Sequence, residues 1–204
     1  MARRLLAWLT WCCIGIPLHA SAQRLDLDVS AGFGGGAVRA AASGQWRFGV
    51  GSRLTVGTGL RLTHYAGESA TYRNQGATTT ALPDRLTIDP AVWGLNLMVS
   101  AQARLAGPIA VGTNLDLVGI AGGPTRQVGA VTVEPARGSL FRYGDNDRGS
   151  LNSEFFLAVS VSPRLELRGG MSHYVVGYTA NAGASTTRYL RFDTVPFVGV
   201  RWRR

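Results

Sequence analysis

The sequence predicts an all-β fold: a closed eight-stranded antiparallel up-and-down transmembrane β-barrel, preceded by a cleaved signal peptide. Three observations predict this fold. Apolar residues recur at every second position over eight runs, the connections between the runs are short and long in turn, and the chain begins with an export signal. The length of 204 residues is that of one domain.

The N-terminal segment has the composition of a signal peptide. Two arginines are followed by an apolar stretch from Leu5 to Leu18 and by the small residues Ala20-Ser21-Ala22, where cleavage is expected. The apolar stretch is short for a helix that spans a membrane. We therefore expect a signal peptide over residues 1–22 and a single barrel domain over residues 23–204. Both cysteines of the chain lie in the signal peptide, which excludes disulfides and thiol chemistry from the mature protein.

Eight alternating runs follow the signal peptide. The clearest begins at Ala91, where seven successive alternate positions from Trp93 to Leu105 are apolar and the residues between them, except Met98, are polar or small. Pro196, inside the last run, requires a bulge or a weakly paired position. The other seven runs are expected at residues 25–33, 54–62, 151–161, 165–178 and 189–202, with one more that ends at residue 50 and one that begins at residue 109.

The connections predict an up-and-down meander. Short turns are expected at residues 51–52, 106–108 and 162–164, and longer connections at 34–43, 66–89, 121–150 and 179–187. An even number of strands places both termini at the end with the short turns.

The distribution of polarity predicts a membrane barrel. One face of the runs is almost free of polar atoms and the other is polar, small and rich in glycine, which is typical of a barrel with lipid outside. A soluble lipocalin-like barrel, with its apolar face inward, is the alternative. Two belts of aromatic residues are expected at the membrane interfaces: Tyr65, Trp93, Tyr174, Tyr178 and Tyr189 near the long connections, and Trp46, Phe48 and Trp202 near the short turns.

The net charge does not indicate a nucleic-acid partner. Without the two arginines of the signal peptide, the mature chain has 19 arginines and 12 acidic residues, a net charge of +7. The arginines are scattered singly, and export separates the chain from cytoplasmic nucleic acid. We expect them to be solvated or paired with acids.

The polar faces of the runs predict a barrel interior filled by ion pairs. Six acids and six arginines occupy these positions, so their charges balance, and an eight-stranded barrel is only wide enough for side chains to fill it. Met98, Phe156, Tyr174 and Phe197 share the inward face. The predicted network consists of Asp26, Asp28, Arg47, Arg61, Arg104, Asp116, Glu154, Glu166, Arg168, Arg191, Asp193 and Arg201.

Two segments carry a resemblance to known proteins: VGTNLDLVGI (Val111 to Ile120) and YGDNDRGSLNSEFFL (Tyr143 to Leu157). They are similar to bacterial outer-membrane β-barrel domain proteins, and the whole mature chain resembles the small eight-stranded barrels of the OmpA/OmpX type. The resemblance implies an integral protein of the bacterial outer membrane with both termini periplasmic. The implied partners are outer-membrane lipids, lipopolysaccharide and the barrel-assembly machinery. Such barrels commonly end on an aromatic residue, whereas here two arginines follow Trp202.

The sequence offers two weak candidates for chemistry. The stretch from Asp145 to Glu154 is acidic, but it lacks the ligand spacing of an EF-type calcium loop, and a turn-rich loop end explains it. Lipid A deacylases use a Ser and a His on one face of a strand, whereas Ser172 and His173 are adjacent and point to opposite faces.

We therefore expect no enzymatic activity, cofactor or metal. The expected function is structural or surface-contact, through extracellular loops at residues 66–89 and 121–150 that could hold a ligand. A monomer is expected. The alternatives are a lipid-modifying enzyme similar to lipid A deacylases and a small solute channel.

Overall fold

The computed structural model describes residues 21–76, 82–142, 148–183 and 185–204. The predicted signal peptide lies outside the described residues except for Ser21 and Ala22, with which the first strand begins. No helix among the described residues is long and apolar enough to cross a membrane.

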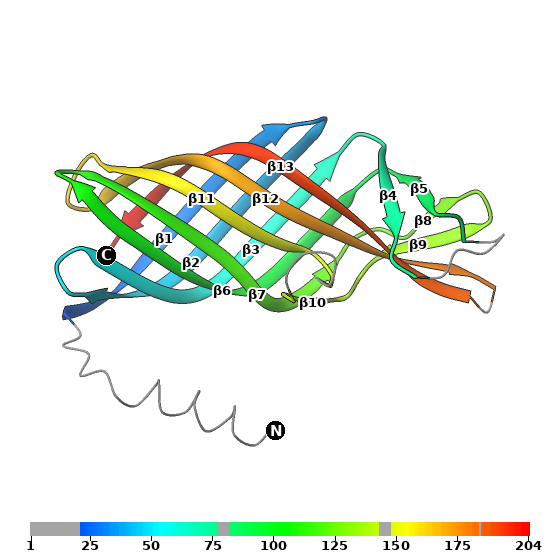
Figure 1. The fold of residues 1–204 in the computed structure, drawn as a ribbon, viewed down its shortest axis with the longest axis horizontal. Coiled ribbons are helices and arrows are strands. Elements are labelled where there is room, and N and C mark those ends of the chain that lie inside the picture. Colours follow the sequence, from blue (N-terminus) through cyan, green and yellow to red (C-terminus); the bar gives the residue numbers. More distant parts are fainter. Residues whose placement is uncertain (1–20, 77–81, 143–147, 184) are drawn as a thin grey trace, which may run out of the picture.

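Within these residues the chain forms thirteen β-strands in one antiparallel sheet (Figure 1). Eight of them, of ten to nineteen residues, correspond to the eight expected runs. These are β1 (Ser21–Gly34), β2 (Ala37–Val50), β3 (Leu54–Gly67), β6 (Ala91–Ala106), β7 (Ile109–Gly122), β11 (Leu151–Ser160), β12 (Leu165–Ala182) and β13 (Ser185–Arg203). The short strands are β4 (Ala70–Asn74), β5 (Arg85–Ile88), β8 (Arg126–Val128), β9 (Val131–Pro135) and β10 (Gly138–Leu140).

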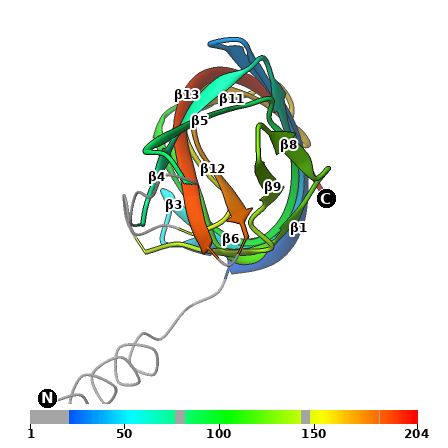
Figure 2. The same ribbon diagram turned by 90° about the vertical axis from the view of Figure 1, so that its right-hand side faces the viewer.

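The eight long strands pair in a ring, seen end-on in Figure 2. Each long strand pairs antiparallel with the next one along the chain, and β13 pairs both with β12 and with β1. Gly51 and Gly107 form short turns with φ of 64° and 51°, a conformation that glycine adopts without steric cost. The first and last long strands therefore place both described ends at the end with the short turns.

The predicted count of eight strands is wrong, because the five short strands lie in the two longest predicted loops. Strands of three to five residues contain too few alternations to be recognised by periodicity. Two other predicted loops are also wrong: residues 34–43 and 179–187 are mostly strand, with tight turns at Gly35–Gly36 and near Gly183. Alanine and threonine on both faces of these segments conceal the alternation.

Burial alternates along the ring with apolar side chains outside. On β2, Trp46 is 49% exposed whereas the neighbouring Arg47 is 1% exposed. All the exposed large apolar residues of the described chain lie on the eight long strands, except Leu140 and Val161. A bulge in β7 opposite Leu97 and Met98 leaves Leu117 without a paired partner there and shifts the alternation, so that Val118 and Ile120 are exposed.

Beyond the ring, the buried face of the sheet is apolar, whereas within the ring it is polar and charged. The far ends of β12 and β13 extend past the ring, where β9 pairs with β12 and β4 pairs with β13. The β4–β5 and β8–β9 hairpins enclose an apolar core that includes Tyr72, Leu86, Ile88, Val133 and Tyr178. The long-loop end is thus a folded extension with an ordinary apolar interior.

This extension corrects the predicted aromatic belts. At the long-loop end Trp93 is exposed, but Tyr65, Tyr174, Tyr178 and Tyr189 are at most 1% exposed and belong to the apolar core. Near the short turns, Trp46 and Trp202 are exposed as expected. The sequence also predicted Tyr174 on the inward face, and the structure confirms that position rather than the belt.

Glycines in the ring make room for the aromatic side chains inside it. Phe156 on β11 lies directly opposite Gly112 on β7 and Gly170 on β12. A Cβ atom added to Gly112 would lie 2.6 Å from Cζ of Phe156, which is closer than packed atoms allow. The phenyl group therefore fits because Gly112 has no side chain, whereas a Cβ atom on Gly170 would meet the backbone carbonyl oxygen of Phe155.

We expect Gly112→Ala to destabilise the fold by about 1–3 kcal/mol, because the added methyl group overpacks the interior. Gly138→Ala is the matched control, since a Cβ atom there meets nothing within 4 Å. Urea titration of the refolded proteins, followed by heat-modifiable gel mobility, measures the difference. Equal midpoints for the two variants would contradict the packing described for Phe156.

Candidate functional site: a buried network of ion pairs

The interior of the ring contains equal numbers of buried charges of each sign. Among the described residues five arginines and five acids are buried, none of them more than 5% exposed. They come from seven of the eight long strands. The buried arginines are Arg39, Arg47, Arg61, Arg168 and Arg201, and the buried acids are Asp26, Asp28, Asp116, Glu154 and Glu166.

Glu154 on β11 is the centre of the network. Its carboxylate is 2.8 Å from Nη1 of Arg39, 3.4 Å from Nη2 of Arg61 and 3.6 Å from Nη1 of Arg168. Asn114 also donates a hydrogen bond of 2.6 Å to it. A charge that has left water needs such partners, because its desolvation costs several kcal/mol. One carboxylate thus links strands β2, β3, β7, β11 and β12 across the interior.

A second group of contacts lies towards the short turns. Arg201 is 2.8 Å from Glu166 and 3.4 Å from Asp28, and Gln102 accepts hydrogen bonds from both Arg201 and Arg47. Arg47 is 3.3 Å from Asp26. The exposed end of the network is closed by Arg203, which contacts Glu166.

The two groups form one continuous network. Arg168 contacts both Asp28 and Glu154, and Arg61 extends the chain from Glu154 to Asp116 at 3.3 Å. Asp116 in turn accepts hydrogen bonds from the side chain of Asn96 and the backbone of Asn152. Ion pairs, joined at one point by the hydrogen bonds of Gln102, therefore connect one end of the interior with the other.

Aromatic rings separate the layers of charge. The guanidinium carbon of Arg168 lies 4.6 Å from the ring centroid of Phe156 and 5.7 Å from that of Phe197. Arg201 and Arg39 approach the same two rings at 5.6 and 5.3 Å. A desolvated cation near an aromatic face gains further stabilisation. The interior is occupied by side chains in mutual contact.

The structure places nine of the twelve predicted network residues in this network. Arg104 is exposed near the short turn between β6 and β7, so it is not one of the buried charges of the interior. Arg191 and Asp193 pair with each other at 2.7 Å, are partly exposed and lie apart from the network, on β13. Sequence reasoning missed Arg39, because residues 34–43 were assigned to a loop. The apolar residues Val38 and Ala40 on either side of Arg39 were the signal in the sequence that could have placed it on the inward face of a strand.

The two weak candidates for chemistry do not form a site in the described residues. Ser172 points inward and donates a hydrogen bond of 2.6 Å to Asn152, whereas His173 is exposed and stacks on Phe192. Of the acidic stretch from Asp145 to Glu154, residues 145–147 lie outside the described residues, and Glu154 belongs to the network. The described residues contain no cluster of three His, Cys, Asp or Glu side chains suited to a metal ion.

We expect Glu154→Gln to destabilise the protein by about 3–5 kcal/mol, because three buried arginines lose a shared carboxylate. Glu134→Gln is the control: its carboxylate pairs with the exposed Arg137 at 3.8 Å, and such pairs contribute about 1 kcal/mol or less. Urea unfolding of both variants in the same detergent gives the comparison. A Glu154→Gln protein as stable as wild type would show that the interior charges do not depend on Glu154.

No protein-family model matches the chain, and no curated protein matches it in sequence. Among solved structures it is similar to a major outer membrane protein from Thermus thermophilus, with 14% identity and a TM-score of 0.42, over 90% of this chain and 100% of that one. It is also similar to OmpT, an outer membrane protein of Vibrio cholerae, with 11% identity and a TM-score of 0.21, over 87% of this chain and 64% of that one. Likeness at this level carries no argument about location or activity, and the resemblance to barrels of the OmpA/OmpX type stays a prediction.

Proposed function

We propose that the protein is an integral β-barrel of the bacterial outer membrane, closed by its eight long strands. Its function is then to hold a folded extracellular extension at the cell surface. The observation that carries the proposal is the reversal of polarity along single strands. On β12, Met171 is exposed and Ser172 is buried within the ring, whereas Tyr178 and Ala180 are buried in the apolar core beyond it.

This reversal is expected of a chain that passes from lipid to water. In water, a sheet buries its apolar face, as the β4–β5 and β8–β9 hairpins do. A continuous exposed apolar surface around the ring would be unfavourable in water and favourable in lipid. The soluble lipocalin-like alternative requires the apolar face of the ring to point inward, which is opposite to the observed burial.

The orientation follows from the two unequal ends. The short turns and both described ends of the chain lie at one end, and the hairpins β4–β5 and β8–β9 lie at the other (Figure 1). We propose that the termini are periplasmic and that residues 66–89 and 121–150 face the outside. The partners would then be outer-membrane lipids, lipopolysaccharide and the barrel-assembly machinery, with an extracellular ligand bound by the extension of a monomer.

The filled interior favours a scaffold over a solute channel. Each buried arginine of the described ring has a carboxylate within 3.6 Å, and Phe156 and Phe197 occupy the space between the ion pairs. Ser172 and His173 on opposite faces give no support to the alternative of a lipid-modifying enzyme.

We expect Leu97→Arg, at a residue 41% exposed on the outer face of β6, to lower stability by about 2–4 kcal/mol in lipid vesicles, because it places a charge in hydrocarbon. Gln127→Arg, at an exposed position of β8 outside the ring, is the control and should be neutral. Folding into vesicles, followed by gel mobility and urea titration, measures both. A Leu97→Arg protein that inserts as well as wild type would contradict the membrane location of this face.

We expect the purified protein to show no steady single-channel steps in a planar bilayer, because paired side chains occupy the lumen. The same preparation must show the heat-modifiable mobility of a folded barrel, so that silence is not caused by unfolded protein. Reproducible conductance steps of one size would contradict the scaffold and favour the solute channel.

A further inference from the structure

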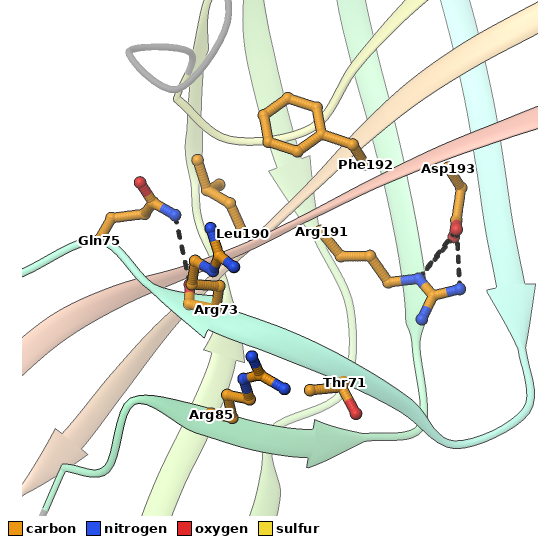
Figure 3. A pocket seen from close by; sticks show the side chains of 8 residues that line it. All are labelled: Thr71, Arg73, Gln75, Arg85, Leu190, Arg191, Phe192 and Asp193. Carbon is orange, nitrogen blue, oxygen red and sulfur yellow. Dashed lines mark hydrogen bonds and ion pairs between the residues drawn. The ribbon is translucent and has the colours of Figure 1, made fainter.

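A cluster of arginines lies where β13 leaves the ring. The pairing of β13 with β1 ends at Phe197, and β4 pairs with β13 only at Tyr189 and Leu190. Neither β1 nor β4 covers the edge of β13 between these points. A hollow of about 490 Å³ lies here, shown in Figure 3. It is lined by residues of β4, β5 and β13, among them Arg73, Arg85 and Arg191.

The charges of this hollow are not balanced. Arg73 and Arg85 are directly opposite each other in the β4–β5 hairpin. Like charges at such positions destabilise a hairpin. Among the described residues that line the hollow, Asp193 is the only acid, and it already binds Arg191 through both carboxylate oxygens and accepts a hydrogen bond from Tyr65. Arg85 also pairs with Asp84 at 3.6 Å, but both side chains of that pair are exposed, so its contribution is small.

An apolar groove of about 700 Å³ adjoins the hollow on the outer face of the ring. Phe192 lines both spaces. Phe141 lines the groove and packs on the small cluster of Leu151, Val175 and Leu190, and Phe155 completes the apolar lining. A ligand that fits both spaces has an anionic head group and an apolar tail.

We propose that this notch binds one anionic lipid of the surrounding membrane. Arg73 and Arg85 bind the phosphate of the head group, and an acyl chain lies in the groove beside Phe192. Guanidinium groups bind phosphate oxygens through paired, charge-assisted hydrogen bonds, and a bound phosphate removes the repulsion between the two opposed arginines. The cluster lies at the boundary between the apolar ring and the extension, which is where lipid head groups meet the protein. The inference rests on the proposed membrane location.

Native mass spectrometry of the refolded mature chain, released from nonionic micelles, tests the proposal. The probes are dihexanoyl phosphatidic acid, dihexanoyl phosphatidylcholine and inorganic phosphate. We expect one molecule of phosphatidic acid to bind about tenfold more tightly than either of the other two. Equal binding of the two lipids would overturn the anionic specificity, and equal binding of inorganic phosphate would overturn the role of the acyl chain.

The double variant Arg73→Gln, Arg85→Gln should lose this preference. The matched control is Arg137→Gln with Arg164→Gln, two exposed arginines outside both spaces, which removes the same charge. The single variant Arg73→Glu, which pairs the hairpin positions with opposite charges, should fold at least as well as wild type and should bind no phosphatidic acid selectively. A preference that persists in the double variant would overturn the site. Insertion into vesicles is measured separately, so a failure of the lipid site and a failure of the membrane location are distinguishable.

Discussion

The pairing of charges around Glu154 is the interaction on which the ring depends. The interior of an eight-stranded ring is only wide enough for side chains to fill it. A buried arginine on one strand must therefore pair with an acid on another strand. Glu154 meets this requirement for Arg39, Arg61 and Arg168 at once. Because Arg39 and Arg61 come from β2 and β3, the ion pairs also join strands that do not share backbone hydrogen bonds with β11. The same ion pairs therefore satisfy the buried charges and connect strands across the ring.

The aromatic side chains inside the ring fill the space that the ion pairs leave. Phe156 and Phe197 lie between the ion pairs and contact the faces of the guanidinium groups, which leaves room for little else. Gly112 lies opposite Phe156, and its missing side chain leaves room for the phenyl ring. At this position the small residue is required by the large one opposite it.

The change of polarity along β12 and β13 connects the fold to the two proposals. The same strands expose apolar residues in the ring and bury them in the extension, as Met171 and Tyr178 do on β12. At the transition, the edge of β13 between Leu190 and Phe197 pairs with neither β1 nor β4, so the sheet is open there. Arg73, Arg85 and Phe192 gather at this opening. Both proposals rest on this transition.

The sequence by itself determined the inside-out alternation, the eight long strands and nine of the twelve interior residues, because the face of a strand residue follows from its position alone. Tertiary structure decided the rest. Arg39 belongs to the network because β2 begins earlier than predicted, whereas Arg104 is exposed beside a short turn. Four tyrosines predicted for an interfacial belt are buried in the apolar core that the hairpins complete. The partners of Glu154, like the position of Arg73 and Phe192 in one hollow, depend on the register of strands distant in the chain. No local pattern contains that information, because register is set only when the whole ring is paired.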